Sequence, residues 1–326
     1  MKNKKVGIVI IGRNEGERLI LCLESVIKAQ VPSIYVDSQS IDNSVFEAES
    51  RDIKTIVLDE SAPVNASRAR NSGFKALVDE YPRLEYIHFI DADCELDPKW
   101  LEHCLLEFES SKFTAVVCGR LHEKYKNKNI YTRLCDMDWY IEPGEVDACG
   151  GIATIRCSVM IETKGFNEQM IAGADPELYF RIRKKNYKII CLPVDMGTHD
   201  SNMQYFSEYW KRSVKTGYAY MSKMILNGSK KPVISAVVWA FCLPICIFLM
   251  SYAFSNLFMI MFLLYPVQVL KIYKNMSIKK VHSKYNNLLY ATFCLLGKFA
   301  EFFGISKYIF NLFSTSKQQL IEYKGK

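Results

Sequence analysis

Short apolar runs alternate with segments of helical spacing in the first part of the chain. Residues 6–11 are apolar except for one glycine, which predicts a fully buried strand. Leu19, Leu23, Val26 and Ile27 then recur at the spacing of one helix face. Further strands are predicted at 33–36, 55–58 and 86–90, and a helix at 65–78. This alternation predicts an α/β fold, a mostly parallel sheet with helices on both faces.

Polar side chains gather where these predicted strands end. The residues are Arg13, Glu15, Asp37, Asp42, Asp91 and Asp93. Ligands of parallel α/β sheets lie beyond the carboxyl ends of the strands. The convergence therefore predicts a nucleotide-type site at this edge of the sheet.

Asp91 and Asp93 leave the fourth predicted strand on the same side, because side chains alternate along a strand. Two such carboxylates repel each other unless a cation lies between them. Mg²⁺ or Mn²⁺ takes carboxylate oxygens and fills its other positions with water and phosphate oxygens. The pattern favours a metal–diphosphate site, and the alternative is a solvated acidic turn before the next helix.

The composition changes late in the chain. No charged residue occurs at 232–270, a run long enough for two membrane passes of roughly 20 residues each. Lysines flank the run on both sides, which predicts a transmembrane hairpin with both ends in the cytoplasm. The alternative is a very apolar pair of buried helices.

Two further helical segments flank this hairpin. Residues 204–231 combine aromatic and basic side chains, which predicts an amphipathic helix in the membrane interface. In the basic tail at 271–326, residues 286–313 are apolar but interrupted by Lys298, Glu301 and Lys307. The charge-free part is too short to span, so an in-plane or packing helix is expected. The predicted catalytic domain is 1–203 and the hairpin 232–270.

Composition excludes some classes of protein. The net charge of +7 is modest, and the basic residues form no stripe that would predict nucleic-acid binding. The 11 cysteines show no paired spacing and no zinc pattern. No signal peptide is recognisable at the start of the chain, so the cysteines are expected to be reduced.

An ordered set of motifs resembles the family 2 inverting glycosyltransferases, with the A-type, Rossmann-like nucleotide-sugar fold. The pieces are VIIGRNEGERL at 9–19, VDSQSIDNS at 36–44, ASRARNSGF at 66–74, FIDADCEL at 89–96, GGIATIRCSVMIETKGFNEQ at 150–169 and GADPELYFRIRKKNYKI at 173–189. The resemblance covers about the first 200 residues. It implies that the chain binds a nucleotide-diphosphate sugar with Mg²⁺ or Mn²⁺.

The resemblance assigns roles to particular residues. Glu15 and Asp37 are expected to hold the base and ribose of the donor, and Asp93 is expected to bind the metal, with His199 as an additional ligand. The remaining residues expected in the nucleotide-sugar site are Arg13, Arg70 and Asp91. Gln39 stands where the family commonly has glycine.

The family's later motif places the catalytic base at Asp175. Ala174 stands where the family usually has glutamate, which leaves Glu177 as an acceptor contact or alternative base. Pro176 suits the first turn of a helix, so Asp175 is expected at a helix N-terminus, where the helix dipole favours a charged carboxylate. An N-cap aspartate without chemistry is the structural alternative.

These features predict an enzyme that transfers one sugar, with inversion, to an acceptor hydroxyl. The hairpin suggests a lipid-linked acceptor in cell-surface polysaccharide synthesis, at a bacterial inner membrane with the catalytic domain in the cytoplasm. A sugar-nucleotide pyrophosphorylase would need a glycine-rich phosphate loop after the first strand, which the sequence lacks. A catalytically silent membrane scaffold that binds a partner glycosyltransferase is the other alternative, favoured only by Ala174.

Overall fold

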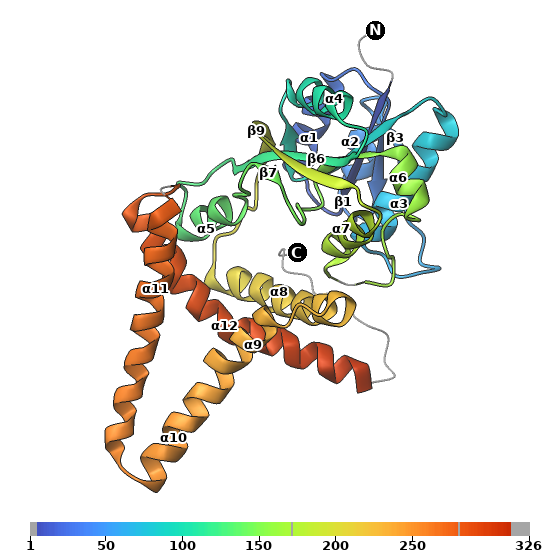
Figure 1. Ribbon diagram of the computed structural model, residues 1–326. Helices are drawn as coiled ribbons and strands as arrows, with labels where there is room; N and C mark the ends of the chain where they lie inside the picture. The colour runs from blue at the N-terminus through green and yellow to red at the C-terminus, as the bar shows by residue number, and fades with distance from the viewer. Residues whose placement is uncertain (1–4, 171, 280, 314–326) are drawn as a thin grey trace. The chain divides into compact units, whose positions relative to one another are not determined.

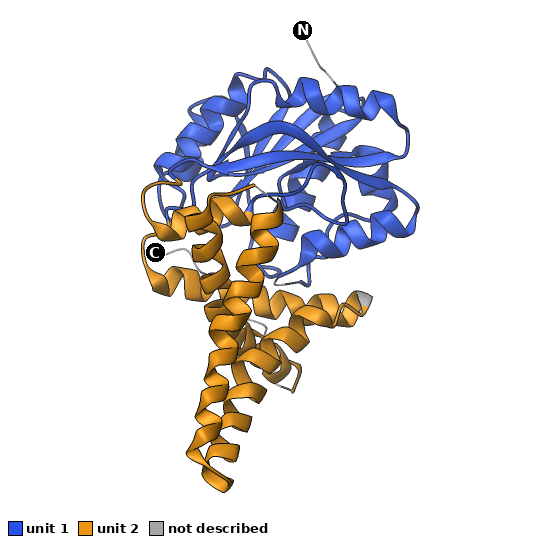
Figure 2. Ribbon diagram, turned by 60° about the vertical axis from the view of Figure 1, so that its left-hand side comes forward, with its two compact units in different colours: residues 1–125, 139–202, 326 blue, residues 126–138, 203–325 orange. Residues whose placement is uncertain are grey.

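The protein consists of two compact units, which are described separately (Figure 2). The computed structural model describes residues 5–170, 172–279 and 281–313. Among the described residues, those of 5–125 and 139–202 form unit 1, and those of 126–138 and 203–313 form unit 2. Residues 126–138 thus group with the later helices, and the predicted end of the catalytic domain at residue 203 stays a prediction.

Unit 1 is built on a sheet of nine strands with the order β3-β2-β1-β4-β8-β6-β9-β5, in which β7 also pairs with β9 (Figure 1). The strands are β1 (Val6–Gly12), β2 (Ser33–Asp37), β3 (Lys54–Val57), β4 (Tyr86–Asp91), β5 (Cys94–Leu96), β6 (Thr114–Glu123), β7 (Gly144–Glu145), β8 (Ala153–Arg156) and β9 (Lys188–His199). The helices of this unit are α1 (Glu17–Ile27), α2 (Ser44–Glu49), α3 (Ala66–Glu80), α4 (Trp100–Ser110), α6 (Cys157–Glu162) and α7 (Ala174–Lys184).

The sheet is mixed rather than mostly parallel. Strands β3, β2, β1 and β4 pair in parallel, as the alternating pattern predicts. Strand β8 then runs antiparallel between β4 and β6, and β5 runs antiparallel to β9. The pattern of alternation covers only the first four strands, so it carries no information on the direction of the later ones.

The core of unit 1 follows from this arrangement. Every residue from Val6 to Ile11 is buried, as expected for a central strand covered on both faces. Helix α3 packs closely on β1 and β2 through Gly73, where a Cβ atom would lie 2.4 Å from Val9 Cγ1. Asn65 caps this helix by accepting a hydrogen bond from the Arg68 backbone N–H at 3.0 Å. The close packing fixes the position of Arg70, one turn along α3.

Unit 2 is helical. Its elements are α5 (Ile130–Asp138), α8 (Phe206–Asn227), α9 (Lys231–Val237), the π-helical turn η1 (Val238–Cys242), α10 (Leu243–Ala253), the 3₁₀ segment η2 (Asn256–Leu263), α11 (Leu264–Lys279) and α12 (Lys284–Phe313). Helices α8 and α12 approach each other at their backbones, because a Cβ atom on Gly217 would lie 2.0 Å from the Glu301 carbonyl oxygen. Tyr209 on α8 also donates a hydrogen bond to the Phe293 carbonyl at 2.7 Å.

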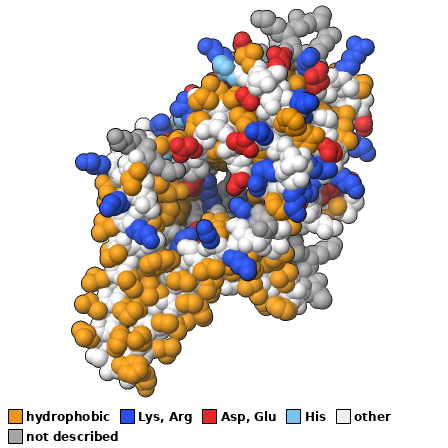
Figure 3. Space-filling model, in the orientation of Figure 1, with side chains coloured by type: hydrophobic (Ala, Val, Ile, Leu, Met, Phe, Trp, Pro, Cys, Tyr) orange, Lys and Arg blue, Asp and Glu red, His pale blue; other side chains and the backbone are white. Residues whose placement is uncertain are grey.

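Three helical segments of the described part of the chain are long and apolar enough to cross a membrane: Lys231–Ala253, Asn256–Ile278 and Lys284–Phe313. The first two form the predicted hairpin, and Figure 3 shows hydrophobic side chains covering it. The third differs from expectation, because an 18-residue stretch of this helix is apolar enough to cross a membrane although the helix also contains charged residues. Residues 314–326 of the predicted tail lie outside the described residues.

Candidate active site

The predicted polar residues of the first strands lie together at the carboxyl edge of the sheet. The register of the parallel strands pairs Gly12 with Asp37 and Ile11 with Asp91. Asp37 and Asp91 therefore flank the end of β1, with the turn that carries Arg13 and Glu15 next along the chain. This arrangement confirms the convergence that the spacing of strands and polar residues predicts.

Arg70 joins two of the candidate residues. Its Nη2 lies 2.8 Å from Asp91 Oδ1 and its Nη1 lies 3.3 Å from Asp175 Oδ1. Arg70 is 5% exposed and its guanidinium lies over the Phe166 ring, 5.4 Å from the centroid. Burial disfavours the charge, but Asp91 and Asp175 outweigh it and raise the pKa of Arg70. One buried cation thus holds Asp175 beside the tip of β4.

Gly151 gives this guanidinium its space. A Cβ atom at position 151 would lie 2.1 Å from Arg70 Nη2, closer than any side chain can approach. The motif at 150–169 begins with two glycines. This close contact explains why the second of them, Gly151, has no side chain. Any larger residue there would displace Arg70 from Asp91 and Asp175.

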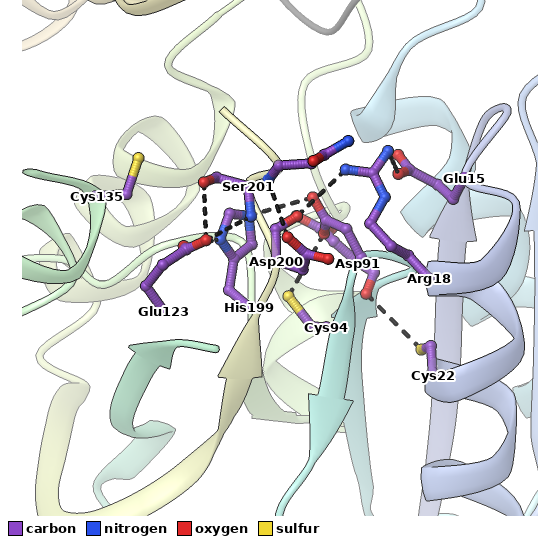
Figure 4. A network of polar contacts seen from close by, with 12 residues as sticks. Glu15, Arg18, Cys22, Asp91, Cys94, Glu123, Cys135, His199, Asp200 and Ser201 are labelled. Carbon is purple, nitrogen blue, oxygen red and sulfur yellow. Dashed lines mark hydrogen bonds and ion pairs between the residues drawn. The ribbon is translucent and has the colours of Figure 1, made fainter. Parts of the chain in front are cut away.

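His199 lies at the other side of the same edge (Figure 4). It meets Asp93 there. His199 Nε2 lies 3.2 Å from Asp93 Oδ2, and both residues are buried, with 7% and 5% exposure respectively. The short strand β5 brings them together, because it starts directly after Asp93 and pairs Cys94 with His199. The sequence analysis missed β5, which is only 3 residues long.

The side chains of Asp93 and His199 fit a hard divalent cation. Two neighbouring ligand atoms of an octahedral ion with bonds of about 2.1 Å lie about 3 Å apart. The separation of Asp93 Oδ2 and His199 Nε2 matches this, and a carboxylate with an imidazole suits Mn²⁺. The nearby Cys94 thiol completes a group whose ligand atoms lie within 4.8 Å of one another. Because thiolates are soft ligands, we interpret Cys94 as a hydrogen-bond donor to Asp93 Oδ1, 3.5 Å away.

The second ring nitrogen of His199, Nδ1, contacts Glu123, which is not among the predicted site residues. His199 Nδ1 lies 2.8 Å from Glu123 Oε2, and the Trp139 ring packs edge-on against the imidazole, 4.9 Å between centroids. Burial lowers the pKa of His199, but Asp93 and Glu123 outweigh it and raise the pKa to about 9. Glu123 lies in none of the motifs and is far from His199 along the chain. Only the pairing of β6 with β9 shows that the two residues meet.

The Asp37 side chain, which is expected to contact the donor, is enclosed by neighbouring residues in this structure. It has no exposed surface, and its carboxylate accepts hydrogen bonds from the Tyr35 hydroxyl at 2.8 Å and the Ser40 backbone N–H at 2.7 Å. The Ser40 hydroxyl also donates to it at 2.5 Å. In this conformation Asp37 holds the backbone of the loop at 37–44, and Ser40 in turn accepts from the Asn14 N–H at 2.9 Å.

Glu15 and Arg13 lie in the turn after β1. Glu15 is buried and forms an ion pair with Arg18, 2.7 Å between Oε2 and Nη2, whereas Arg13 is exposed. Arg18 also donates to the Asp200 carbonyl at 3.2 Å, which ties the start of α1 to the end of β9. Arg18 is not among the predicted site residues, although it lies only three residues after Glu15, in the first turn of α1.

The two candidate bases occupy different surroundings. Asp175 lies in the first turn of α7 and its side chain is 28% exposed. Glu177 is 8% exposed, and its oxygens accept hydrogen bonds from Arg181 Nε at 2.6 Å and Nη2 at 2.7 Å. Arg181 donates further to the carbonyls of Thr163 and Gly165. Glu177 therefore connects α7, through Arg181, to the loop after α6. Asp175 instead contacts Arg70, which also contacts Asp91 at the carboxyl edge of the sheet.

Residues 7–163 match the family model described as glycosyl transferase family 2. No curated protein matches the chain.

Three solved structures are similar in fold. A mannosyltransferase, PcManGT, from Pyrobaculum calidifontis, in complex with GDP-Man and Mn²⁺, has a TM-score of 0.62 at 13% identity, over 94% of this chain and 87% of that chain. Glucosyl-3-phosphoglycerate synthase from Mycobacterium tuberculosis, with Mn²⁺ and UDP-glucose, has a TM-score of 0.46 at 13% identity, over 68% of this chain and 79% of that one. S. aureus TarS 1–349 has a TM-score of 0.47 at 13% identity, over 67% and 65%. The first of these shows that the fold is that of the A-type glycosyltransferases.

Proposed function

Because residues 7–163 match the family model of glycosyl transferase family 2, we propose that the protein is a nucleotide-sugar glycosyltransferase. It transfers one sugar with inversion and depends on a divalent metal. The observation that carries this proposal is the chain of contacts Asp91–Arg70–Asp175. It holds a partly exposed carboxylate beside the tip of β4, two residues before the candidate metal ligand Asp93. A base next to a diphosphate site is what an inverting displacement needs.

Asp93 and His199 would hold Mg²⁺ or Mn²⁺, which, when bound, offsets the charge that develops on the leaving diphosphate. Around this ion, the protein's own residues orient the donor. The turn with Arg13 and Glu15 and the loop held by Asp37 border the same edge, where the nucleoside is proposed to bind. Asp91, paired with Arg70, is proposed to contact the sugar side of the donor.

Asp175 is the proposed base. It accepts the proton of the acceptor hydroxyl as the acceptor oxygen bonds to the anomeric carbon and the sugar–phosphate bond breaks, so the diphosphate leaves from the opposite face. Its place in the first turn of α7 favours the charged carboxylate before the acceptor arrives. The hydrogen bonds that both Glu177 oxygens accept from Arg181 support the choice of Asp175 over Glu177.

The acceptor is proposed to be lipid-linked, in cell-surface polysaccharide synthesis. Three helices long and apolar enough to cross a membrane support membrane association, and lysines at both ends of the hairpin favour a cytoplasmic catalytic domain at a bacterial inner membrane. A hydroxyl on a lipid-linked glycan would then be held near the bilayer surface, where a membrane-bound enzyme can reach it.

Purified full-length protein can test the proposal. UDP-, GDP- and dTDP-sugars are added with and without Mn²⁺, and the donor that binds should raise the melting temperature only with the metal. Asp93→Asn should then lose several kcal/mol of transition-state stabilisation, about a thousandfold in rate or more. Undiminished sugar transfer in excess EDTA would contradict metal dependence.

One observation favours a catalytically silent scaffold. Ala174 is buried at the first position of α7, so no carboxylate stands where the resemblance expects one. A scaffold would hydrolyse no donor nucleotide, with or without an acceptor, whereas a transferase usually shows slow hydrolysis. Measuring release of the nucleoside diphosphate therefore separates the two functions.

A further inference from the structure

We propose that Glu123 is a positioning residue for the candidate metal site: its carboxylate fixes the His199 imidazole so that Nε2 faces Asp93 and the ion. The inference rests on the proposed metal-dependent function. Glu123 would not touch the metal or the donor, and it would act only through His199.

Both oxygens of the buried Glu123 carboxylate form hydrogen bonds, one with His199 and the other with Ser201. Glu123 is 2% exposed at the end of β6. Oε2 lies 2.8 Å from His199 Nδ1, and Oε1 accepts from the Ser201 backbone N–H at 2.7 Å and the Ser201 hydroxyl at 2.8 Å (Figure 4). Burying a carboxylate is unfavourable unless such partners compensate for the lost water. Glu123 is thus a buried carboxylate in direct contact with a candidate metal ligand, His199.

The chemistry of imidazole explains why this contact matters. A neutral imidazole carries one proton, and the nitrogen without it can bind a metal. A carboxylate at Nδ1 is an acceptor only, so it keeps a proton on Nδ1, and Nε2 is then the nitrogen that gives up its proton when a metal binds beside Asp93. Carboxylates that bind the distal nitrogen of a ligating histidine also fix the ring orientation and increase its basicity.

An irregularity in the strand pairing places Glu123 opposite His199. In the first part of the β6–β9 pair, Cys118 is the partner of Cys191, but shifts in register on either side of Arg120 follow. A regular continuation of the Cys118 pairing would bring Met196 opposite Glu123. After the shifts, the partner is His199. Irregular pairing that redirects side chains is frequent next to active sites.

Direct binding of Mn²⁺ to the full-length protein tests the inference without any activity measurement. Wild type, Glu123→Gln and Glu95→Gln are compared for Mn²⁺ affinity and for ¹⁴N modulation in pulsed electron paramagnetic resonance, which detects a directly bound imidazole. Gln at 123 has an amide NH₂ in place of one acceptor oxygen, so it cannot accept from both His199 and Ser201. Glu95 is a matched control: it also lies near the site, but its carboxylate pairs with Lys124, 2.5 Å away.

The expected result is a Mn²⁺ affinity about 10- to 100-fold weaker for Glu123→Gln, with the ¹⁴N modulation reduced or lost. Glu95→Gln should stay close to wild type, which excludes loss of negative charge as the cause. If Glu123→Gln only melts at a lower temperature and keeps both the affinity and the modulation, Glu123 is purely structural and the inference is wrong.

Two further results separate this inference from the proposed function. Wild type that binds Mn²⁺ without ¹⁴N modulation overturns the role of His199 and Glu123 but leaves metal dependence through Asp93 intact. Wild type that binds no Mn²⁺, even with the donor nucleotide, overturns the metal-dependent function itself. Should Glu123→Gln fail to fold, ¹⁵N spectra of histidine-labelled wild type with Mg²⁺ decide: a proton on Nδ1 of His199 supports the inference, and a proton on Nε2 contradicts it.

Discussion

At the scale of single residues, the same side-chain type has different tasks depending on its partners. Asp91 and Asp175 share the cation of Arg70, while Asp37 is enclosed by the hydroxyls and backbone of its own loop. Glu177 and Glu123 are both buried, but one holds Arg181 and the other holds His199. The partners therefore decide which carboxylates are available for chemistry.

The assignment of the base can be tested by a pair of substitutions. Asp175→Asn should lose about 10²–10⁴-fold in single-turnover transfer. Its donor affinity should change little, because the other residues proposed for the donor remain. Glu177→Gln is the matched control: it should lower the stability of the protein by about 1–3 kcal/mol through the weakened Arg181 contact, with a smaller effect on the chemical step. Loss of turnover in Glu177→Gln but not in Asp175→Asn would show that the base is Glu177.

His88 predicts a dependence of stability on pH. It is fully buried on β4, where Trp100 Nε1 donates to its Nδ1 at 3.2 Å, and burial lowers its pKa to about 3 from 6.5. Below pH 6.5 the unfolded chain binds a proton that the folded protein excludes. The stabilising contribution of neutral His88 is therefore complete above pH 6.5 and decreases as the pH falls toward 3.

The measurement is the free energy of unfolding as a function of pH for wild type and His88→Gln. The difference between the two should change by up to about 1.4 kcal/mol per pH unit between pH 6 and 4, with wild type losing more. A pH-independent difference would show that His88 is not neutral in the folded protein.

At the scale of elements, helix α12 lies along α8 inside unit 2. The two backbones approach closely at Gly217 and again at Gly304, where a Cβ atom would lie 2.0 Å from the Val214 carbonyl oxygen. Helix α8 carries several lysines and arginines and is not among the helices apolar enough to span a membrane. If α12 crossed the bilayer, α8 would have to enter it with these charges, which is unfavourable.

We therefore expect α12 to lie in the membrane interface rather than to cross the bilayer. Ser283 and Ser306, which are exposed near the start and in the second half of α12, are replaced by cysteine one at a time. A membrane-impermeant maleimide should add label at both positions from the cytoplasmic side only, measured against the unsubstituted protein. Labelling of the two positions from opposite sides would make α12 a third span.

At the scale of the whole molecule, the division into units changes what a truncation should do. The described residues of the donor and metal sites all lie in unit 1, but α5 belongs to unit 2 and packs against α12, with Tyr131 and Phe293 ring centroids 6.1 Å apart. A chain that ends at Asn227 loses α12 and leaves apolar surfaces of α5 and α8 uncovered. It should still bind the donor nucleotide with nearly full-length affinity.

Calorimetry with the nucleotide and Mn²⁺ measures the affinity, and alkaline carbonate extraction measures membrane association. The full-length protein should resist extraction, and the chain ending at Asn227 should be released. The shortened chain should also aggregate more readily than a soluble domain of its size because of the uncovered helices. Release of the full-length protein by carbonate without detergent would contradict an integral membrane protein.

The sequence by itself determines much of the framework of this protein. Uninterrupted apolar runs such as 6–11 specify buried strands, because a central strand needs apolar side chains on both faces. The uncharged run at 232–270 specifies a hairpin of membrane-spanning length in the same way. Both features are local: they depend only on residues close together in the chain. The ordered motifs likewise indicate the family and its nucleotide-sugar chemistry.

Tertiary structure alone decides which polar residues meet. Arg70 joins Asp91 to Asp175, and Glu123 contacts His199, although none of these pairs is close in the chain. The contacts depend on strand order, on the short β5 and on the shifted register of β6 with β9, none of which leaves a periodic pattern in the sequence. Likewise, the sequence does not show which neighbours an aspartate at a strand end contacts. The packing around Asp37 directs its carboxylate to the backbone of its own loop and leaves it no exposed surface in this structure.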